Sequence, residues 1–122
     1  MLGFILLIIS ILLSAILLPV GWLYSLFTLR LSIKRLGAYF KTIAISIDQL
    51  GNVVLSNLLN DVLINKNGYR FGDEDETISK VLGINKANNT LLKTGKIVSS
   101  MLNSIDKNHV EKASKSDNWL YL

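Results

Sequence analysis

The first 29 residues carry no charged side chain, and this constrains the chain more than any other feature. They read MLGFILLIISILLSAILLPVGWLYSLFTL, from Met1 to Leu29. A helix needs roughly 20 apolar residues to cross about 30 Å of hydrocarbon. Inside lipid every backbone N–H and C=O must be paired within the segment, and a helix achieves this. The sequence therefore predicts one N-terminal transmembrane helix over residues 1–29.

Pro19 lies inside this segment and removes one backbone donor, which predicts a kink near Pro19 or a helix in two parts. A cleaved signal peptide would instead have a basic first region and an apolar run of about 7–15 residues. This segment lacks the basic region and is longer than such a run. A buried core helix is also disfavoured, because the polar remainder of the chain could not wrap it.

The residues at the end of the apolar segment predict its orientation. Aromatic rings with a polar edge favour the headgroup level, and basic residues accumulate on the cytoplasmic side of a membrane. Both signals occur here, as a membrane-interface group of Trp22, Tyr24, Arg30, Lys34 and Arg35. We therefore expect a single-pass protein with its N-terminus outside and its C-terminal body in the cytoplasm or the interior of a virion.

All thirteen Lys and Arg residues and all nine Asp and Glu residues lie from Arg30 onward, with a net charge of +4. The basic residues come first, since Lys41 still precedes the first acid, Asp48. A basic cluster beside an apolar span suits anionic lipid headgroups. The dense basic stripe with interleaved aromatics that indicates nucleic-acid binding is missing. The sequence also lacks cysteine, which excludes disulfides and thiolate metal sites.

A second segment, residues 30–64, is amphipathic. Its apolar residues recur every three or four positions, which predicts one long helix with an apolar stripe. Gly37 and Gly51 are positions where this helix could bend. It could lie in the membrane interface or pack its stripe on later helices, and we favour packing because those helices also need a partner. The stripe is Ile33, Leu36, Phe40, Ile43, Ile47, Leu50, Val54, Leu58 and Val62.

The remaining residues, 65–122, predict a small helical body, so the whole chain is expected to be all-α. After a turn-rich break over residues 65–72, a helix is expected from about Glu74 to Leu82, with Gly83 ending it. Asn88 or Asn89 can cap a third helix. Asp106 is expected to cap a last helix that ends near Ser114. The third helix would have an apolar face of Leu91, Val98, Met101, Leu102 and Ile105, and the apolar end Trp119, Leu120, Tyr121 and Leu122 is expected to dock on the body, a partner or a membrane.

An acidic run from Asp73 to Glu76 is the first candidate site. Carboxylates in the first turn of a helix interact favourably with its free N–H groups and its macrodipole. Several carboxylates together could also bind a divalent cation, but the spacing does not match a calcium-binding EF-hand loop. We favour a helix start with Asp73 or Asp75 as N-cap, and expect no metal and no cofactor.

The one histidine, His109, lies three residues after Asp106. A carboxylate that orients a histidine is half of a catalytic pair, but no nucleophile is marked beside it. No phosphate-binding loop, dinucleotide-binding glycine pattern or hydrolase serine motif is present. We therefore expect a protein that is not an enzyme, with no catalytic residue. Asp48, Gln49 and Asn52 are expected to hydrogen-bond to the acidic helix start or to its Thr77 and Ser79.

Three short motifs carry a resemblance to a known group of proteins. They are SIDQLGN at residues 46–52, DETIS at 75–79, and DKNH at 106–109 followed by Ser114. Over residues 43–115 the chain resembles small membrane-associated proteins of bacteriophages and prophages. It departs from them in having Val110 where the group has cysteine, and in a longer insert between the first two motifs. The resemblance implies a phage origin and a shared site at Asp75, Glu76, Thr77, Ser79, Asp106 and His109.

These observations predict a bacteriophage membrane protein with a structural role in the virion membrane or its assembly. Its helical body would bind partner proteins or a second copy of itself, while the lipid bilayer holds its first helix. The alternative is a holin-like lysis protein that oligomerises in the host membrane and permeabilises it. A membrane-tethered hydrolase that uses the acidic run and His109 is a third, less favoured hypothesis.

Overall fold

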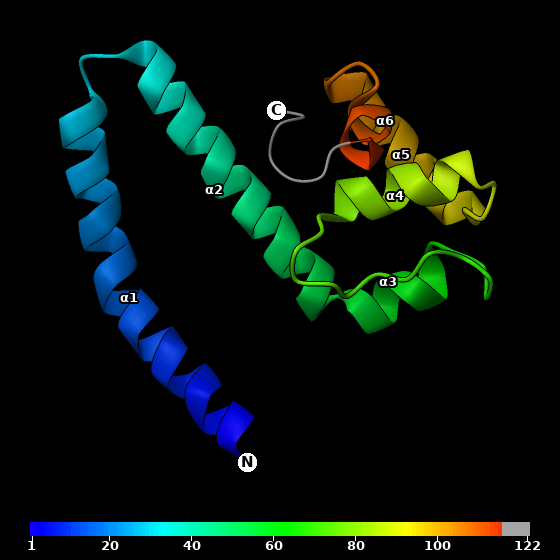
Figure 1. Ribbon diagram of the computed structural model, residues 1–122, viewed down its shortest axis with the longest axis horizontal. Coiled ribbons are helices and arrows are strands. Elements are labelled where there is room, and N and C mark those ends of the chain that lie inside the picture. Colours follow the sequence, from blue (N-terminus) through cyan, green and yellow to red (C-terminus); the bar gives the residue numbers. More distant parts are fainter. Residues whose placement is uncertain (116–122) are drawn as a thin grey trace. The chain divides into compact units, whose positions relative to one another are not determined.

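The computed structural model describes residues 1–115, which form six helices (Figure 1). The prediction of an all-α chain is confirmed, since the only β-type contact in this range is an isolated bridge between Ile64 and Leu91. The expected docking of residues 119–122 lies outside the described part. The chain forms two compact units, residues 1–40 and 41–122. The helices are α1 Leu2–Leu29, α2 Ile33–Val54, α3 Ser56–Val62, α4 Ile78–Ala87, α5 Lys93–Ile105 and α6 His109–Ser114.

Helix α1 is long and apolar enough to cross a membrane, as the sequence predicted. It has 28 residues, none of them buried, and it continues through Pro19 without splitting in two. At its end the Arg30 guanidinium lies 4.1 Å from the centre of the Phe27 ring. Ser32 directly precedes α2, and its hydroxyl accepts a hydrogen bond from the Arg35 N–H in the first turn. Trp22 and Tyr24 are both exposed near the C-terminal end of α1.

The prediction of one helix from Ile33 to Val62 is wrong, because the chain bends by 75° between α2 and α3. The break falls at Leu55 and not at Gly51. Beyond it Leu59 packs against the core of the body. Asn60 hydrogen-bonds to both the N–H and the C=O of Phe71. These contacts hold α3 against the body.

Helix α2 meets the body with its polar side, which also corrects our expectation for the apolar stripe. Ile45 is the one apolar residue of α2 that is buried, and Asn52 is the buried polar one. The stripe residues Ile47, Leu50 and Val54 are 62–70% exposed. The stripe therefore does not pack on later helices, because hydrogen bonds from the polar side of α2 hold it to the body.

The core of the body lies between α4, α5, α6 and the segment around α3 (Figure 1). Gly83 lies in the middle of α4, so the prediction that it ends this helix is wrong. A Cβ atom at Gly83 would lie 1.9 Å from the carbonyl oxygen of Val110. The glycine is therefore needed because α4 and α6 approach closely there. The buried core consists of Leu63, Ile64, Phe71, Val81, Leu82, Leu91 and Val110.

Helix α4 begins after the acidic run, not within it. Its N-cap is Thr77, whose hydroxyl accepts a hydrogen bond from the Lys80 N–H at 3.0 Å. The prediction of Asp73 or Asp75 as N-cap is therefore wrong. Threonine is also a favourable N-cap residue. Thr77 is itself buried, as are several residues of the helix that it caps.

The starts of the last two helices also differ from the predictions. Asn88 ends α4 and Asn89 has a left-handed backbone with φ of 56°, so neither caps α5, which begins after Leu92. Asp106 ends α5, and Asn108 is the N-cap of α6. On α5 the predicted apolar face is divided: Val98 and Leu102 pack on the core, Met101 and Ile105 are exposed, and Leu91 precedes the helix.

We predict that Gly83→Ala lowers the free energy of unfolding of the body by about 3 kcal/mol, because the new methyl group forces α4 and α6 apart. Gly37→Ala is the matched control, since a Cβ there meets nothing within 4 Å. It should be neutral or stabilise α2 by about 0.5–1 kcal/mol. Urea titration of the full chain in detergent measures both. Equal stability of the two variants would contradict the close packing.

Candidate functional site: a polar latch between helices

The central contact of the site is the side-chain amide of Asn52, which is completely buried. Its nitrogen donates hydrogen bonds to the backbone oxygens of Asp73 and Glu76, both at 2.9 Å. Its oxygen accepts from the N–H of Gly72 at 3.2 Å. One side chain of α2 thus binds three backbone groups of the loop before α4. We call the contacts of Asp48, Gln49 and Asn52 with residues 72–79 the polar latch.

Asp48 binds the first turn of α4. One carboxylate oxygen accepts from the Ile78 N–H and the other from the Ser79 hydroxyl, both at 2.9 Å. A negative charge at this place interacts favourably with the helix macrodipole. Gln49 adds a hydrogen bond to the backbone oxygen of Asp75 at 3.2 Å. The structure thus shows the hydrogen bonds expected from the sequence, although α2 and not the acidic run supplies the charge at this helix start.

His109 extends the latch to α6. Its Nε2 lies 3.2 Å from the Ser79 hydroxyl, and its Nδ1 lies 3.0 Å from a carboxylate oxygen of Asp106. The other oxygen of Asp106 accepts a hydrogen bond from the Lys112 ammonium at 3.0 Å. Hydrogen bonds from His109 and then from Lys112 hold the pKa of Asp106 below its ordinary value. A continuous series of contacts therefore runs from Asp48 to Asp106.

The donors and acceptors in this series can be counted. Ser79 has one hydroxyl proton, and Asp48 accepts it when that carboxylate is ionised. His109 must then donate from Nε2 to Ser79 and from Nδ1 to Asp106, since an ionised carboxylate only accepts. All contacts are thus satisfied together when both ring nitrogens of His109 carry a proton. In this arrangement the series fastens α2, α4 and α6 to one another.

The acidic run forms a turn ahead of α4. The Asp73 carboxylate accepts from the Asp75 N–H at 2.9 Å, and the Asp73 backbone oxygen accepts from the Glu76 N–H. The Glu76 carboxylate accepts from the Tyr69 hydroxyl, which raises the pKa of Tyr69 to about 12. Within residues 1–115 no group of three or more His, Asp or Glu is placed to hold a metal ion.

Three further asparagines bridge backbone segments in the same way as Asn52. Asn85 is completely buried and bonds to both backbone groups of Tyr69. Asn60 does the same to Phe71, and Asn103 accepts from the Val110 N–H. These roles were not predicted from the sequence. The available signal was that asparagine is unfavourable inside helices, so its presence there indicates a specific bond.

The structure brings most of the predicted site residues together. Asp48, Ser79, Asp106 and His109 form the series of contacts, and Gln49, Asn52, Asp75, Glu76 and Thr77 lie along the same loop and helix start. In comparisons with known proteins, no protein family, no curated protein and no solved structure matches the chain.

We predict that Asn52→Ala lowers the free energy of unfolding by about 3 kcal/mol, because three backbone groups lose their partner. Asn57→Ala is the control, since Asn57 is exposed on α3; its effect should stay within about 0.5 kcal/mol. Chemical denaturation in detergent measures both. A loss no larger for Asn52→Ala than for the control would show that the latch does not stabilise the body.

We predict that Tyr69 ionises near pH 12, since the Glu76 carboxylate accepts its proton in a hydrogen bond. Because the folded pKa lies above the ordinary value of about 10, the bond stabilises the fold fully below pH 10. That stabilisation is lost as the pH rises towards 12. The phenolate absorbance at alkaline pH measures this, and Tyr69→Phe identifies the signal. Glu76→Gln should return the Tyr69 pKa towards its ordinary value, and an unchanged titration would contradict the assignment.

Proposed function

We propose that the chain is a bacteriophage membrane protein with a structural role in the virion membrane or its assembly. In this proposal α1 spans the bilayer with the N-terminus outside, and the body lies on the cytoplasmic or virion-interior side and binds partner proteins. The phage origin is supported by the motifs at residues 46–52, 75–79 and 106–109. The observation that carries the partner-binding role is an exposed apolar surface on α2 and α3.

Membrane anchoring is supported by the length of α1 and the charge that follows it. Its 28 residues exceed the roughly 20 needed to cross a bilayer. Arg30, Lys34 and Arg35 follow at once, and basic residues favour the cytoplasmic side. Trp22 and Tyr24 lie near the same end, where such rings favour the interface.

The apolar surface consists of Ile47, Leu50, Val54, Leu58 and Val62, which we call the outer ridge. The polar latch turns it away from the core of the body, and each of these residues is at least 41% exposed. Exposed apolar patches of this kind mark interaction sites. Between residues 42 and 65 there is no Lys or Arg. Without basic side chains the outer ridge has no attraction for anionic lipid, so we assign it to a protein partner or a second copy of the chain.

The polar latch supports a structural role better than a catalytic one. Ser79 is 3% exposed, and its hydroxyl donates to Asp48. The Ile78 N–H, which could otherwise stabilise an oxyanion, is bound by the same carboxylate. A hydrolase needs a nucleophile that substrate can reach and free donors beside it. We therefore propose that the chain is not an enzyme and that Ser79, His109 and Asp106 fasten helices.

We predict that Leu58→Asp reduces the amount of the protein in purified phage particles by about 30-fold, because it places a charge in the partner surface. Asn57→Asp is the matched control, since it adds the same charge at the neighbouring exposed residue of α3. Quantitative mass spectrometry of particles measures incorporation, and circular dichroism in detergent verifies that both variants fold.

Three results would contradict this proposal. Equal incorporation of Leu58→Asp and Asn57→Asp would show that the outer ridge does not bind the partner. Permeabilisation and death of host cells when this chain alone is produced, with no protein in particles, would instead support the holin-like lysis protein. Loss of phage yield only in Ser79→Ala and His109→Gln variants that still fold and assemble would favour the hydrolase.

A further inference from the structure

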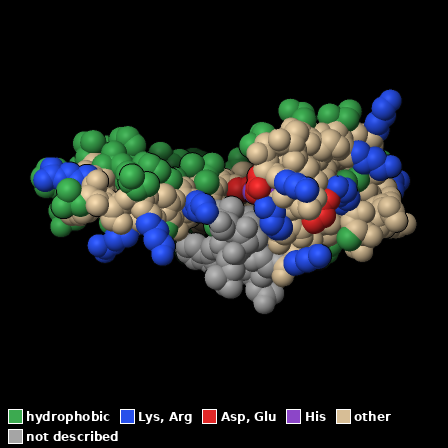
Figure 2. Space-filling view, turned by 90° about the horizontal axis from the view of Figure 1, so that it is seen from above, with side chains coloured by type: hydrophobic (Ala, Val, Ile, Leu, Met, Phe, Trp, Pro, Cys, Tyr) green, Lys and Arg blue, Asp and Glu red, His purple; other side chains and the backbone are tan. Residues whose placement is uncertain are grey.

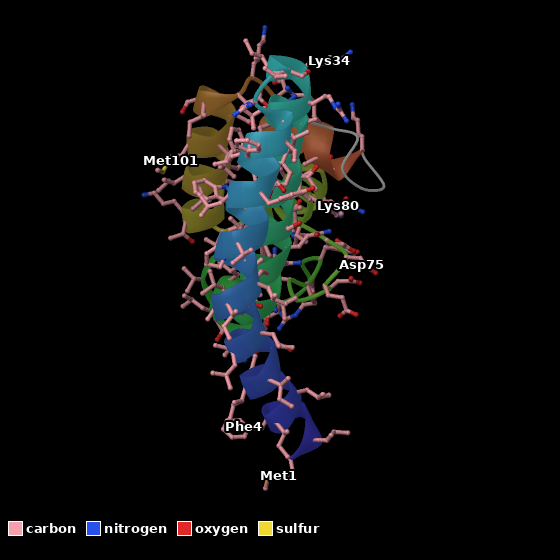
Figure 3. All side chains as sticks on the ribbon, turned by 90° about the vertical axis from the view of Figure 1, so that its left-hand side faces the viewer. Met1, Phe4, Lys34, Asp75, Lys80 and Met101 are labelled. Atoms are coloured by element: carbon pink, nitrogen blue, oxygen red, sulfur yellow. The ribbon has the colours of Figure 1, made fainter. Side chains whose placement is uncertain are left out.

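Helix α5 exposes a second line of apolar side chains, Ile97, Met101 and Ile105, which we call the α5 ridge. Their spacing of four residues places them on one side of the helix. They are 53%, 62% and 83% exposed, respectively. Met101 points outward on the side of the body opposite to Asp75 and Lys80 (Figure 3). The ridge therefore belongs to the outer surface of α5 and not to the core.

The charge around the α5 ridge is positive, unlike that around the outer ridge. The charged side chains of α5 itself are Lys93 and Lys96, and Asp106 follows the helix. Lys93 and Lys96 line an open depression with Ile97 and Met101. Figure 2 shows hydrophobic side chains along one edge of the body with Lys and Arg side chains on the neighbouring surface. Apolar residues beside lysines are typical of a helix that lies in a membrane interface.

A pocket next to this depression adds hydroxyl groups to the positive charge. It lies between the end of α4 and α5, and Lys96, Ser99 and Ser100 line it together with Lys86, whose ammonium is paired with the Glu111 carboxylate. Lys96 and Ser100 line the pocket and the depression alike. Ser99 is 2% exposed, and within the described residues its hydroxyl has no hydrogen-bond partner. Ammonium and hydroxyl donors together suit the oxygens of a phosphate group.

We propose that α5 docks on the surface of an anionic phospholipid membrane, with the α5 ridge at the boundary of the acyl chains and Lys93 and Lys96 on headgroup phosphates. The inference rests on the anchoring of α1, which is part of the proposed function. A tether to the same bilayer raises the effective concentration of lipid near the body. A modest contact area is therefore sufficient for α5 to bind the membrane surface. The body then has two faces with different partners: lipid at α5 and protein at the outer ridge.

Single-cysteine labels test this in the full chain, because the sequence has no cysteine of its own. A label at Met101→Cys reports the environment of the α5 ridge. A label at Asp75→Cys reports the opposite side of the body, and a label at Leu12→Cys reports the middle of α1. Each variant carries a polarity-sensitive fluorophore and is reconstituted in vesicles of phosphatidylcholine, with or without phosphatidylglycerol. Quenching by lipids that carry a nitroxide on the acyl chain reports contact with the bilayer.

We expect the Leu12 label to be quenched in both kinds of vesicle and the Asp75 label in neither. The Met101 label should be quenched only when phosphatidylglycerol is present. Lys96→Gln should lower the ratio of docked to undocked protein about fivefold, as expected for one charge near an anionic surface. Lys80→Gln, which removes the same charge on the other side of the body, should leave that ratio unchanged.

The outcomes separate this inference from the proposed function. Quenching at Leu12 without quenching at Met101 would overturn the docking of α5 and leave the anchor intact. Absence of quenching at Leu12 would overturn the anchor and the inference together. A Met101 label that is shielded from aqueous iodide but not quenched by lipid would show a protein on the α5 ridge, and would also overturn the inference.

Discussion

The buried amide of Asn52 is the contact on which the rest of the body depends. It binds three backbone groups in the loop that leads to α4, and it holds the polar side of α2 against that loop. A buried amide without partners is costly, so α2 cannot rotate to bury its apolar stripe without leaving Asn52 and three backbone groups unpaired. The orientation of α2 and the exposure of its stripe follow from this.

The body has a small apolar core and uses polar contacts to define its helix arrangement. Asn60 and Asn85 bind backbone groups of the loop at Phe71 and Tyr69, respectively, and Asn103 binds the Val110 N–H in the first turn of α6. Asp48 and His109 meet at Ser79 and join α2, α4 and α6. Such networks are geometrically demanding, so a fully paired network favours one packing over others. The cost is that each member is sensitive to substitution.

The two exposed apolar surfaces differ in charge, and this is what assigns them to different partners. No Lys or Arg lies between residues 42 and 65, which contain the outer ridge, whereas Lys93 and Lys96 accompany the α5 ridge. Hydrophobic periodicity alone cannot distinguish a face that packs on the core from a face that binds a partner. On α5 it grouped Val98 with Met101, although Val98 packs on the core and Met101 is 62% exposed.

The sequence by itself determined α1, since its length and lack of charge leave a membrane-spanning helix as the favoured structure. It also determined the all-α class, and it indicated that residues 48–52 pair with residues 75–79. Only the tertiary structure decided the bend at Leu55, the start of α4 at Ile78 and the role of Gly83. Local signals such as a cap or a helix-end glycine are worth about 1 kcal/mol each. Buried hydrogen bonds and a close helix approach are worth more, so packing overrides these signals.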